Sequence, residues 1–319
     1  MTNNTTAVQA TKPLPTTARK WMAIRRNGGL YLLLLPSVIL LVLFAYIPMY
    51  GVTIAFKDYS NALGILGSPW ADPFYKYFLK FFNSYQFSST IRNTLLLSFY
   101  SLIAGFPLPI LLALGLNQMR AERFKRFFQT VSYLPHFIST VVMVGLIIIW
   151  LSPTSGLMGS VYALFGAKAP NLMGEAPLFS SIYVWSDVWQ HMGWNSIVYL
   201  AALASVDPSL YEAATVDGAT PGKKIWYIDL PMIMPTAVIL LIMSAGSIMN
   251  VGFEKVYLMQ NNLNTVNSEV ISTYVYKIGI LSNQYSYSAA INLFNTVVNL
   301  LLLIVVNQVS KRLTENSLW

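Results

Sequence analysis

Residues 207–231 read DPSLYEAATVDGATPGKKIWYIDLP and lie between two long apolar segments of a chain of 319 residues. Asp207 is followed by proline, which is typical of a helix start. The aspartate side chain can accept a hydrogen bond from a backbone N–H group of the first helical turn. Proline has no backbone N–H group, but at the first helical position that group would have no partner within the helix. Gly218 suits the left-handed residue that ends such a helix. Thr220, again followed by proline, repeats the start signal. The stretch therefore predicts two short helices joined by a turn.

The composition indicates a membrane protein. Hydrophobic residues make up 55% of the chain and charged residues 10%, and the mean hydropathy is +0.54, far from the values of soluble domains. There is no cysteine, which excludes disulfides and thiolate metal sites. The net charge is +8. The basic residues stand in short clusters beside apolar segments, which favours a protein that contacts membrane lipid over one that binds nucleic acid.

Several apolar segments reach the roughly 20 residues that cross a hydrocarbon core. They predict an all-α polytopic membrane protein with six transmembrane helices. The expected spans are Leu30–Tyr50, Thr94–Leu116, Ser132–Leu151, Leu178–Ala204, Met232–Val251 and Ala289–Val309. Prolines inside or beside these spans, such as Pro135 and Pro235, predict kinks. Neighbouring helices must then supply hydrogen-bond partners for the backbone carbonyls that each kink leaves free.

The basic residues give the orientation. Six spans place both termini on one side, and that side carries most of the clustered positive charge, which is typical of the cytoplasm. The residues concerned are Arg19, Lys20, Arg25, Arg26, Arg120, Arg123, Lys125, Arg126, Lys223, Lys224, Lys311 and Arg312. We therefore expect a cytoplasmic, mostly disordered segment over 1–28, a six-helix domain over 29–310 that includes the loop 207–231, and a cytoplasmic tail over 311–319.

The loop 207–231 resembles the EAA loop of permease subunits in binding-protein-dependent ATP-binding-cassette (ABC) importers. The resemblance rests on Glu212-Ala213-Ala214, on Gly218, and on Ile228-x-Leu230-Pro231 after a nine-residue spacer. Flanking residues also fit the carbohydrate, maltose-type branch. The loop residues that the resemblance assigns to ATPase coupling are Tyr211, Glu212, Ala213, Ala214, Asp217, Gly218 and Ala219. The alternative is a helix–turn–helix linker that binds no partner.

The resemblance implies the type I ABC importer permease fold and import of a sugar, more specifically an oligosaccharide. It also implies a second permease subunit, usually a different chain, two ABC ATPase subunits, and an extracellular solute-binding protein in a bacterial cytoplasmic membrane. This chain would carry no catalytic residues and no cofactor, since ATP and Mg²⁺ would be bound by the ATPases.

The residues themselves offer little catalytic chemistry. The stretch Gly218–Lys224 is one residue too short for a phosphate-binding loop and ends in lysine rather than serine or threonine. His136 and His191 have no metal-ligand spacing. We therefore predict neither a nucleotide site nor a metal site.

Polar and aromatic residues at membrane depth predict the substrate site, because they normally face a cavity or the bundle interior. Sugars suit an apolar pocket with a ring and a few placed polar groups. The candidates before the loop are Trp189, Met192, Gly193 and Ser196, and those after it are Asn250 and Phe253. Their positions also correspond to substrate contacts in the maltose-type family. The alternative is that these residues pack helices together.

Two further questions stay open at this point. Asp187 and Glu254 allow the alternative of a secondary transporter that couples to ions or protons. Lys255 and Lys277 would suit an acidic uronate-type sugar, whereas the aromatic and amide residues suit a neutral glycan. In the first outer loop, Phe74–Phe82 predicts a short helix in the headgroup layer with Lys76 and Lys80 reaching water.

Overall fold

The protein is described by a computed structural model that covers residues 27–119 and 121–314. The predicted N-terminal segment 1–28 lies almost entirely outside these residues. The predicted tail 311–319 lies partly outside them, and its residues up to Thr314 are the end of helix α18 (Tyr285–Thr314). The described residues form helices and loops without a β-strand. Residues up to Thr53 form one unit and Ile54–Trp319 forms a second.

The first unit is a helix that begins at Gly28. It starts as α2 (Gly28–Leu41) and continues through a π-helical turn at Val42–Tyr46 and α3 (Ile47–Met49). No residue of these three elements is buried. The run of apolar residues, with a single proline at position 36 inside α2, suits a helix surrounded by lipid. It covers the predicted span Leu30–Tyr50 up to Met49, and a 3-10 turn follows from Tyr50.

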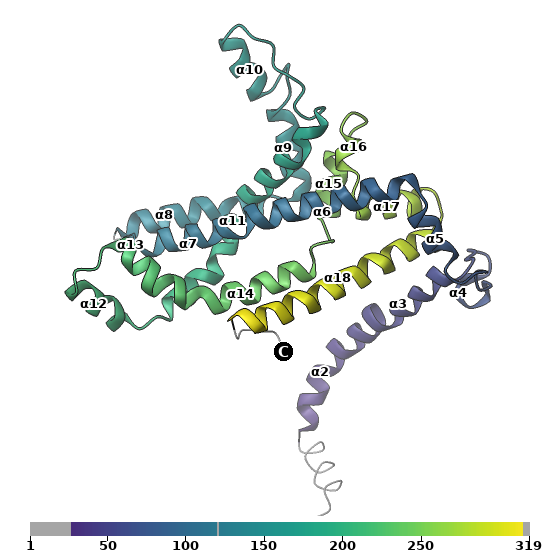
Figure 1. The fold of residues 1–319 in the computed structure, drawn as a ribbon, viewed down its shortest axis with the longest axis horizontal. Coiled ribbons are helices and arrows are strands. Elements are labelled where there is room, and N and C mark those ends of the chain that lie inside the picture. Colours follow the sequence, from purple (N-terminus) through teal and green to yellow (C-terminus); the bar gives the residue numbers. More distant parts are fainter. Residues whose placement is uncertain (1–26, 120, 315–319) are drawn as a thin grey trace, which may run out of the picture. The chain divides into compact units, whose positions relative to one another are not determined.

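The second unit is a bundle of long helices (Figure 1). They are α6 (Tyr85–Gly105), α7 (Pro107–Asn117), α8 (Glu122–Tyr133), α9 (Thr140–Trp150), α11 (Phe179–Ala204), α14 (Leu230–Gly246) and α18 (Tyr285–Thr314). Shorter helices cap its ends or cross its loops: α4 (Gly64–Gly67), α5 (Lys76–Phe82), α10 (Leu157–Leu164), α12 (Pro208–Val216), α13 (Pro221–Lys224), α15 (Phe253–Met259), α16 (Thr265–Ser268) and α17 (Ile271–Tyr276). Helices α12 and α13 lie at one end of the bundle, and α5 and α17 lie at the other.

Helix α11 lies at the centre of the bundle and contacts α6, α7, α8 and α14. The main apolar cluster, built on Val184 and Val188 of α11, joins α6, α9 and α15. A second cluster, toward α12, joins Tyr199 and Leu203 of α11 to α7 and α14. We call this second group the lower cluster; its buried members are Ala113, Leu114, Tyr199, Leu203, Ile233 and Ala237.

Four helices within the described residues are long and apolar enough to cross a membrane, or five if a bent pair counts as one span. They are Gly28–Phe56, Tyr85–Asn117, Pro221–Gly246 and Tyr285–Arg312, with the bent pair Glu122–Phe137 and Thr140–Trp150. The predicted span Leu178–Ala204 matches α11, which has 26 residues but is not in this group. Its Asp, Gln, His and Asn side chains lower its hydropathy. Gln190 is buried, Asp187 and His191 are half-buried, and Asn195 is exposed.

One sequence prediction needs correction, and the contacts of the first outer loop add to another. The third span does not run from Ser132, because α8 ends at Tyr133 and the chain bends by 99° before α9. A short 3-10 turn that contains Pro135 forms this break, since proline cannot continue the helical hydrogen bonds. The short helix near Phe74–Phe82 is present as α5, but it packs on α18: Phe81 is buried there.

The lysines of α5 are also held by the protein. Lys76 Nζ donates to Asp58 Oδ1 at 2.8 Å, and Lys80 Nζ donates to Gln284 Oε1 at 2.9 Å. The hydrogen bond from Lys76 holds the pKa of Asp58 below its ordinary value. Instead of only extending into water, these side chains therefore join α5 to its neighbours.

Candidate functional site

The loop after α11 folds as the capping signals predict. Asp207 Oδ1 accepts from the N–H of Ser209 at 2.9 Å, which starts α12 and lowers the pKa of Asp207. Gly218 ends that helix at φ +68°, a left-handed conformation that only glycine adopts without strain. Thr220 Oγ1 accepts from the N–H of Lys223 at 3.5 Å and starts α13. The prediction of two short capped helices is confirmed.

Helix α12 presents the residues of the EAA resemblance on an open surface. It has no buried residue. Glu212, Ala213, Asp217 and Gly218 are exposed, whereas Tyr211, Ala214 and Ala219 are half-buried. The apolar side chain of Val216 is 88% exposed. Small alanines beside exposed apolar groups form a surface that another protein can approach closely.

One buried carboxylate joins α12 to the bundle. Asp229 is 0% exposed; its Oδ1 accepts from the Tyr211 hydroxyl at 2.5 Å, and its Oδ2 accepts from Gln118 Nε2 at 2.7 Å. Asn117 Nδ2 also donates to Asp229 Oδ1, at 3.3 Å, and to the Tyr211 hydroxyl, at 3.4 Å. We call these four residues the Asp229 cluster. It brings together the end of α7, α12 and the start of α14.

The cluster keeps the Tyr211 hydroxyl as a donor. Burial, and then the hydrogen bond to Asp229, raises the pKa of Tyr211 to about 12. Sequence reasoning included Tyr211 in the loop but missed Asp229, Asn117 and Gln118. The available signal was a single carboxylate directly before Leu230-Pro231, at the start of an apolar run, where an unpaired charge would be unfavourable.

A cavity of about 520 Å³ lies between α6, α7, α11 and the end of α14, within the usual size range of small-molecule sites. We call it the central cavity. Its polar lining includes Ser98, Ser101, Asp187, Asn195, Ser244, Ser247 and Asn250, and its rings are Phe106, Tyr183 and Tyr199. The hydroxyls of Ser98 and Ser101 are buried and have no hydrogen-bond partner among the described residues. Such groups are suited to a ligand with hydroxyls.

The wall of the central cavity beyond α14 is not helical. Helix α14 ends at Gly246, and Ser247, Ile248, Asn250, Val251 and Gly252 line the cavity before α15 begins. Asn299 Oδ1 accepts from the N–H of Met249 at 3.0 Å, while Asn295 and Asn299 both donate to Asn250 Oδ1. Unwound backbone inside a membrane needs such partners or a water-filled cavity, and it is a recurring feature of transport sites.

The structure places the predicted substrate residues in different surroundings. Asn250 lines the central cavity. Phe253 lines a second, smaller cavity, and its ring lies 5.0 Å from that of Tyr276. The four candidates on α11 are absent from the lining of the central cavity; they are Trp189, Met192, Gly193 and Ser196.

The α11 candidates have packing contacts instead. A Cβ atom at Gly193 would lie 2.0 Å from the carbonyl oxygen of Ser132 on α8. Ser196 is fully buried and donates to the Gly193 carbonyl at 2.6 Å. The Trp189 ring lies 6.4 Å from that of Trp150. The α11 residues that line the cavity are Tyr183, Asp187, Asn195, Val198 and Tyr199, of which Asp187 was already noted in the sequence as a possible ion or proton site.

Asp187 is paired where it meets the central cavity. Lys255 Nζ, on a side chain only 5% exposed, donates to Asp187 Oδ1 at 3.1 Å, and His191 Nδ1 lies 3.5 Å from the same oxygen. Lys255 also lies over the Tyr183 ring, 4.9 Å from its centre. The Asp187 carboxylate on the cavity wall is therefore paired with a basic side chain.

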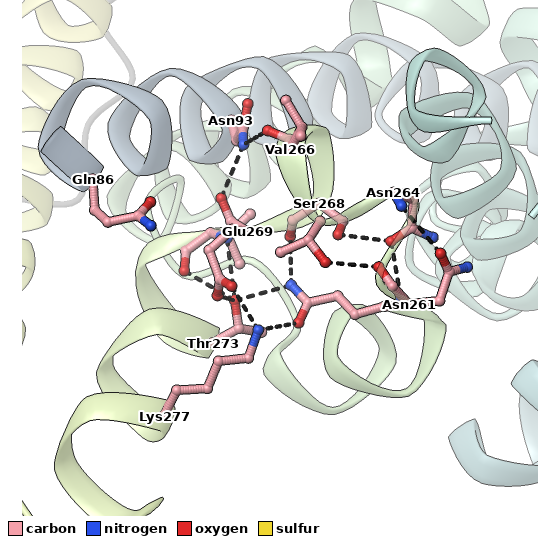
Figure 2. A network of polar contacts seen from close by, with 12 residues as sticks. Gln86, Asn93, Asn261, Asn264, Val266, Ser268, Glu269, Thr273 and Lys277 are labelled. Atoms are coloured by element: carbon pink, nitrogen blue, oxygen red, sulfur yellow. Dashed lines mark hydrogen bonds and ion pairs between the residues drawn. The ribbon is translucent and has the colours of Figure 1, made fainter. Parts of the chain in front are cut away.

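A second polar network lies near α16 and α17 (Figure 2). Lys277 Nζ pairs with Glu269 Oε2 at 2.5 Å and donates to Gln260 Oε1 at 2.9 Å. Asn93 of α6 donates to the carbonyls of Val266 and Glu269. These bonds fix the segment between α15 and α17 against α6. Lys277 is thus bound within the protein and is not a free charge for substrate.

Comparisons with known proteins agree with this geometry. Residues 105–315 match the family described as "Binding-protein-dependent transport system inner membrane component". In Bacillus subtilis (strain 168), the polygalacturonan/rhamnogalacturonan transport system permease protein YteP is 41% identical over 91% of this chain and 90% of its own length. From the same organism, the protein LplB is 40% identical over 94% of both chains.

Solved structures give the same fold. A chain of a bacterial ABC transporter involved in the import of the acidic polysaccharide alginate matches with a TM-score of 0.85 and 40% identity, covering 93% of this chain and 99% of that chain. A bacterial alginate ABC transporter in complex with an alginate pentasaccharide-bound periplasmic protein contains a chain that matches with a TM-score of 0.86 and 39% identity, covering 94% and 100%. These comparisons do not favour a secondary transporter. The chain is a multi-pass membrane protein with the type I ABC importer permease fold, and it belongs to the binding-protein-dependent transport system inner membrane component family.

Proposed function

We propose that this chain forms one half of the transmembrane pathway of an oligosaccharide importer, with the central cavity as its translocation site. The observation that carries the proposal is that the same helices, α7 and α14, line the central cavity and hold the Asp229 cluster at the base of α12. A displacement of α12 would therefore act directly on the cavity walls. The permeases of this family transport and do not catalyse, so hydrolysis of ATP belongs to other subunits.

We propose that the coupling surface consists of α12 residues and the turn that follows them. Its members are Tyr211, Glu212, Ala213, Ala214, Asp217, Gly218 and Ala219. We infer that it binds a cleft on one of two ABC ATPase subunits, which hold ATP and Mg²⁺. Shifting the transporter from mostly inward to mostly outward takes about 5.5 kcal/mol of differential binding. A capped helix with a fixed turn is stiff enough to transmit such a difference, whereas a mobile loop is not.

The remaining partners follow from the geometry of one chain. We infer that a second permease completes the pathway and that the two permeases form a heterodimer. An extracellular solute-binding protein would deliver the sugar at the end opposite to α12. The assembly would lie in a bacterial cytoplasmic membrane with both termini in the cytoplasm, an orientation supported by the clustered basic residues of the sequence.

We propose that the sugar contains uronic acid. Two observations support this class. YteP and the alginate transporters are named for acidic polysaccharides. In this chain, the carboxylate on the cavity wall, Asp187, is paired with Lys255 and lies near His191, so it does not repel an anion as a bare carboxylate would.

Purification of the tagged chain from its native membrane tests the assembly. A second permease and an ABC ATPase should co-purify, and Gly218→Asp should remove the ATPase. Gly166→Asp is the matched control, since Gly166 also has φ +68° and open space around it but lies in the loop after α10. Loss of the ATPase in both variants, or in neither, would argue against α12 as the coupling surface.

The substrate class is tested with the assembled importer in lipid nanodiscs together with its binding protein. ATP hydrolysis is measured with oligogalacturonides, alginate oligosaccharides and neutral arabino-oligosaccharides. Stimulation by the uronates and not by the neutral sugar supports the acidic class. Stimulation by the neutral sugar alone would reject it while leaving the importer function intact.

A further inference from the structure

We propose that Asp229 is a positioning residue for coupling: through its hydrogen bonds, it makes the displacement of α12 move α7 and α14 together. This inference rests on the proposed coupling function of α12. It assigns the transmission to one buried carboxylate that lies outside the exposed coupling surface.

The contacts of α12 leave few other routes. None of its residues is buried, so no apolar core of its own holds it against the bundle. Its polar contacts to other elements are the bonds of Tyr211 in the Asp229 cluster and a bond from Lys224 on α13 to Thr215, at 2.8 Å. Because α13 belongs to the same loop, the Asp229 cluster is the polar connection between α12 and the long helices within residues 27–119 and 121–314.

Asp229 is well placed to divide a displacement between two helices. One carboxylate oxygen bonds to Tyr211, and the other bonds to Gln118 at the end of α7. Asp229 itself is the last residue of a π-helical turn, Ile225–Asp229, that leads directly into α14. Such turns are frequent at functional sites, because their irregular hydrogen bonds allow a local change of register.

The path continues into the central cavity through packed side chains. Ile225 and Leu230, on either side of Asp229, pack against the lower cluster. Phe106 of the α6–α7 junction and Leu240 of α14 pack against the same cluster, and both also line the central cavity. A close-packed group transmits displacement because it has little free volume.

Both oxygens of Asp229 act as hydrogen-bond acceptors in this arrangement. Tyr211, Gln118 and Asn117 all direct donors at its two oxygens. Asparagine has the same shape but would direct an N–H group at one of these donors. Asp229→Asn therefore removes a bond without creating a cavity, which separates the role of the charge from the role of volume.

The test uses the complete importer with its second permease and ATPases in lipid nanodiscs. This chain contains no cysteine, so cysteines introduced in place of Leu111 on α7 and Met243 on α14, both exposed, carry spin labels at defined points. The distance between the labels is measured without nucleotide and after trapping with ATP and vanadate. No sugar is required for this measurement.

In the wild-type importer, trapping should change the distance between the labels. Asp229→Asn should lose most of this shift while the ATPases stay bound and hydrolyse ATP. Adding Gln118→Glu should restore the shift, because the amide and the carboxylate then exchange places across the bond. A residue needed only for folding would not be rescued in this way.

Tyr211→Phe offers a milder variant with the same expected loss. Its control is Tyr227→Phe, since the Tyr227 side chain is exposed and its hydroxyl makes no hydrogen bond to the described residues. A wild-type shift in both Asp229→Asn and Tyr211→Phe would overturn the inference and leave the coupling surface standing. Absence of bound ATPase in the wild type would overturn both proposals.

Discussion

The backbone of Gly193 in α11 lies directly against the carbonyl of Ser132 in α8, with space for a hydrogen atom but not for a methyl group. An added Cβ would approach the Ser132 oxygen to 2.0 Å. Gly193→Ala should therefore separate the two helices and lower the free energy of unfolding by about 1–3 kcal/mol. Thermal unfolding in detergent measures this change. Gly115→Ala is the control, because nothing lies within 4 Å of that position; an equal loss there would contradict the contact.

The backbone conformation at Gly218, and not the size of the new side chain, should decide which replacements are tolerated. No atom lies within 4 Å of an added Cβ, but φ is +68°. Gly218→Val should destabilise the turn by about 1–2 kcal/mol, and Gly218→Asn should do so less, because asparagine accepts this conformation. Hydrogen exchange of α12 amides measures the effect. Equal exchange in the two variants would contradict this explanation.

The bond between Tyr211 and Asp229 should be insensitive to pH in the physiological range. The folded-state pKa of Tyr211 is raised to about 12 from an ordinary value of about 10. A raised pKa means that the bond contributes fully below about pH 10 and is lost only as the pH rises toward 12. The ratio of ATPase stimulation in the wild type to that in Tyr211→Phe should therefore be constant from about pH 6.5 to 9. A ratio that fell within this range would show that another group titrates.

The two faces of α11 should differ in their effect on transport. Asn195→Leu removes an amide from the central cavity and should raise KM for oligogalacturonide uptake about threefold to tenfold, the equivalent of one hydrogen bond. Trp189→Phe, on the face toward α9, should change KM by less than about twofold, because it keeps an aromatic ring in the same place. Uptake into proteoliposomes measures both values. The opposite ranking would place the pathway on the other face.

Local features of this chain were predictable because their causes are adjacent in sequence. The caps at Asp207 and Thr220 and the left-handed Gly218 depend on residues within one or two helical turns. The spans were also predictable in position, since apolar length is a property of each segment alone. Pro135 predicts a kink before α9, but the size of the bend, 99°, depends on the helices around it.

Contacts between distant segments were not predictable in the same way. The Asp229 cluster joins residues more than 90 positions apart, and no spacing rule relates Asn117 to Tyr211. On α11, the sequence showed polar and small residues but not which face each would occupy. Gly193 and Ser196 pack toward α8, whereas Asn195 meets the central cavity. That choice depends on how the helix is rotated against its neighbours.

The polarity of α11 also bears on how this protein is made. A segment that carries Asp187, Gln190, His191 and Asn195 is poorly suited to leave the translocon for lipid by itself, since one aspartate at the centre of a helix opposes insertion by about 2.5–3.5 kcal/mol. The α6–α7 segment is synthesised earlier and contacts α11 extensively, so it can receive the helix laterally. Biogenesis of this chain would then depend on the order of synthesis, with α11 retained at the translocon until a protein surface, and not the bilayer, accepts its polar side.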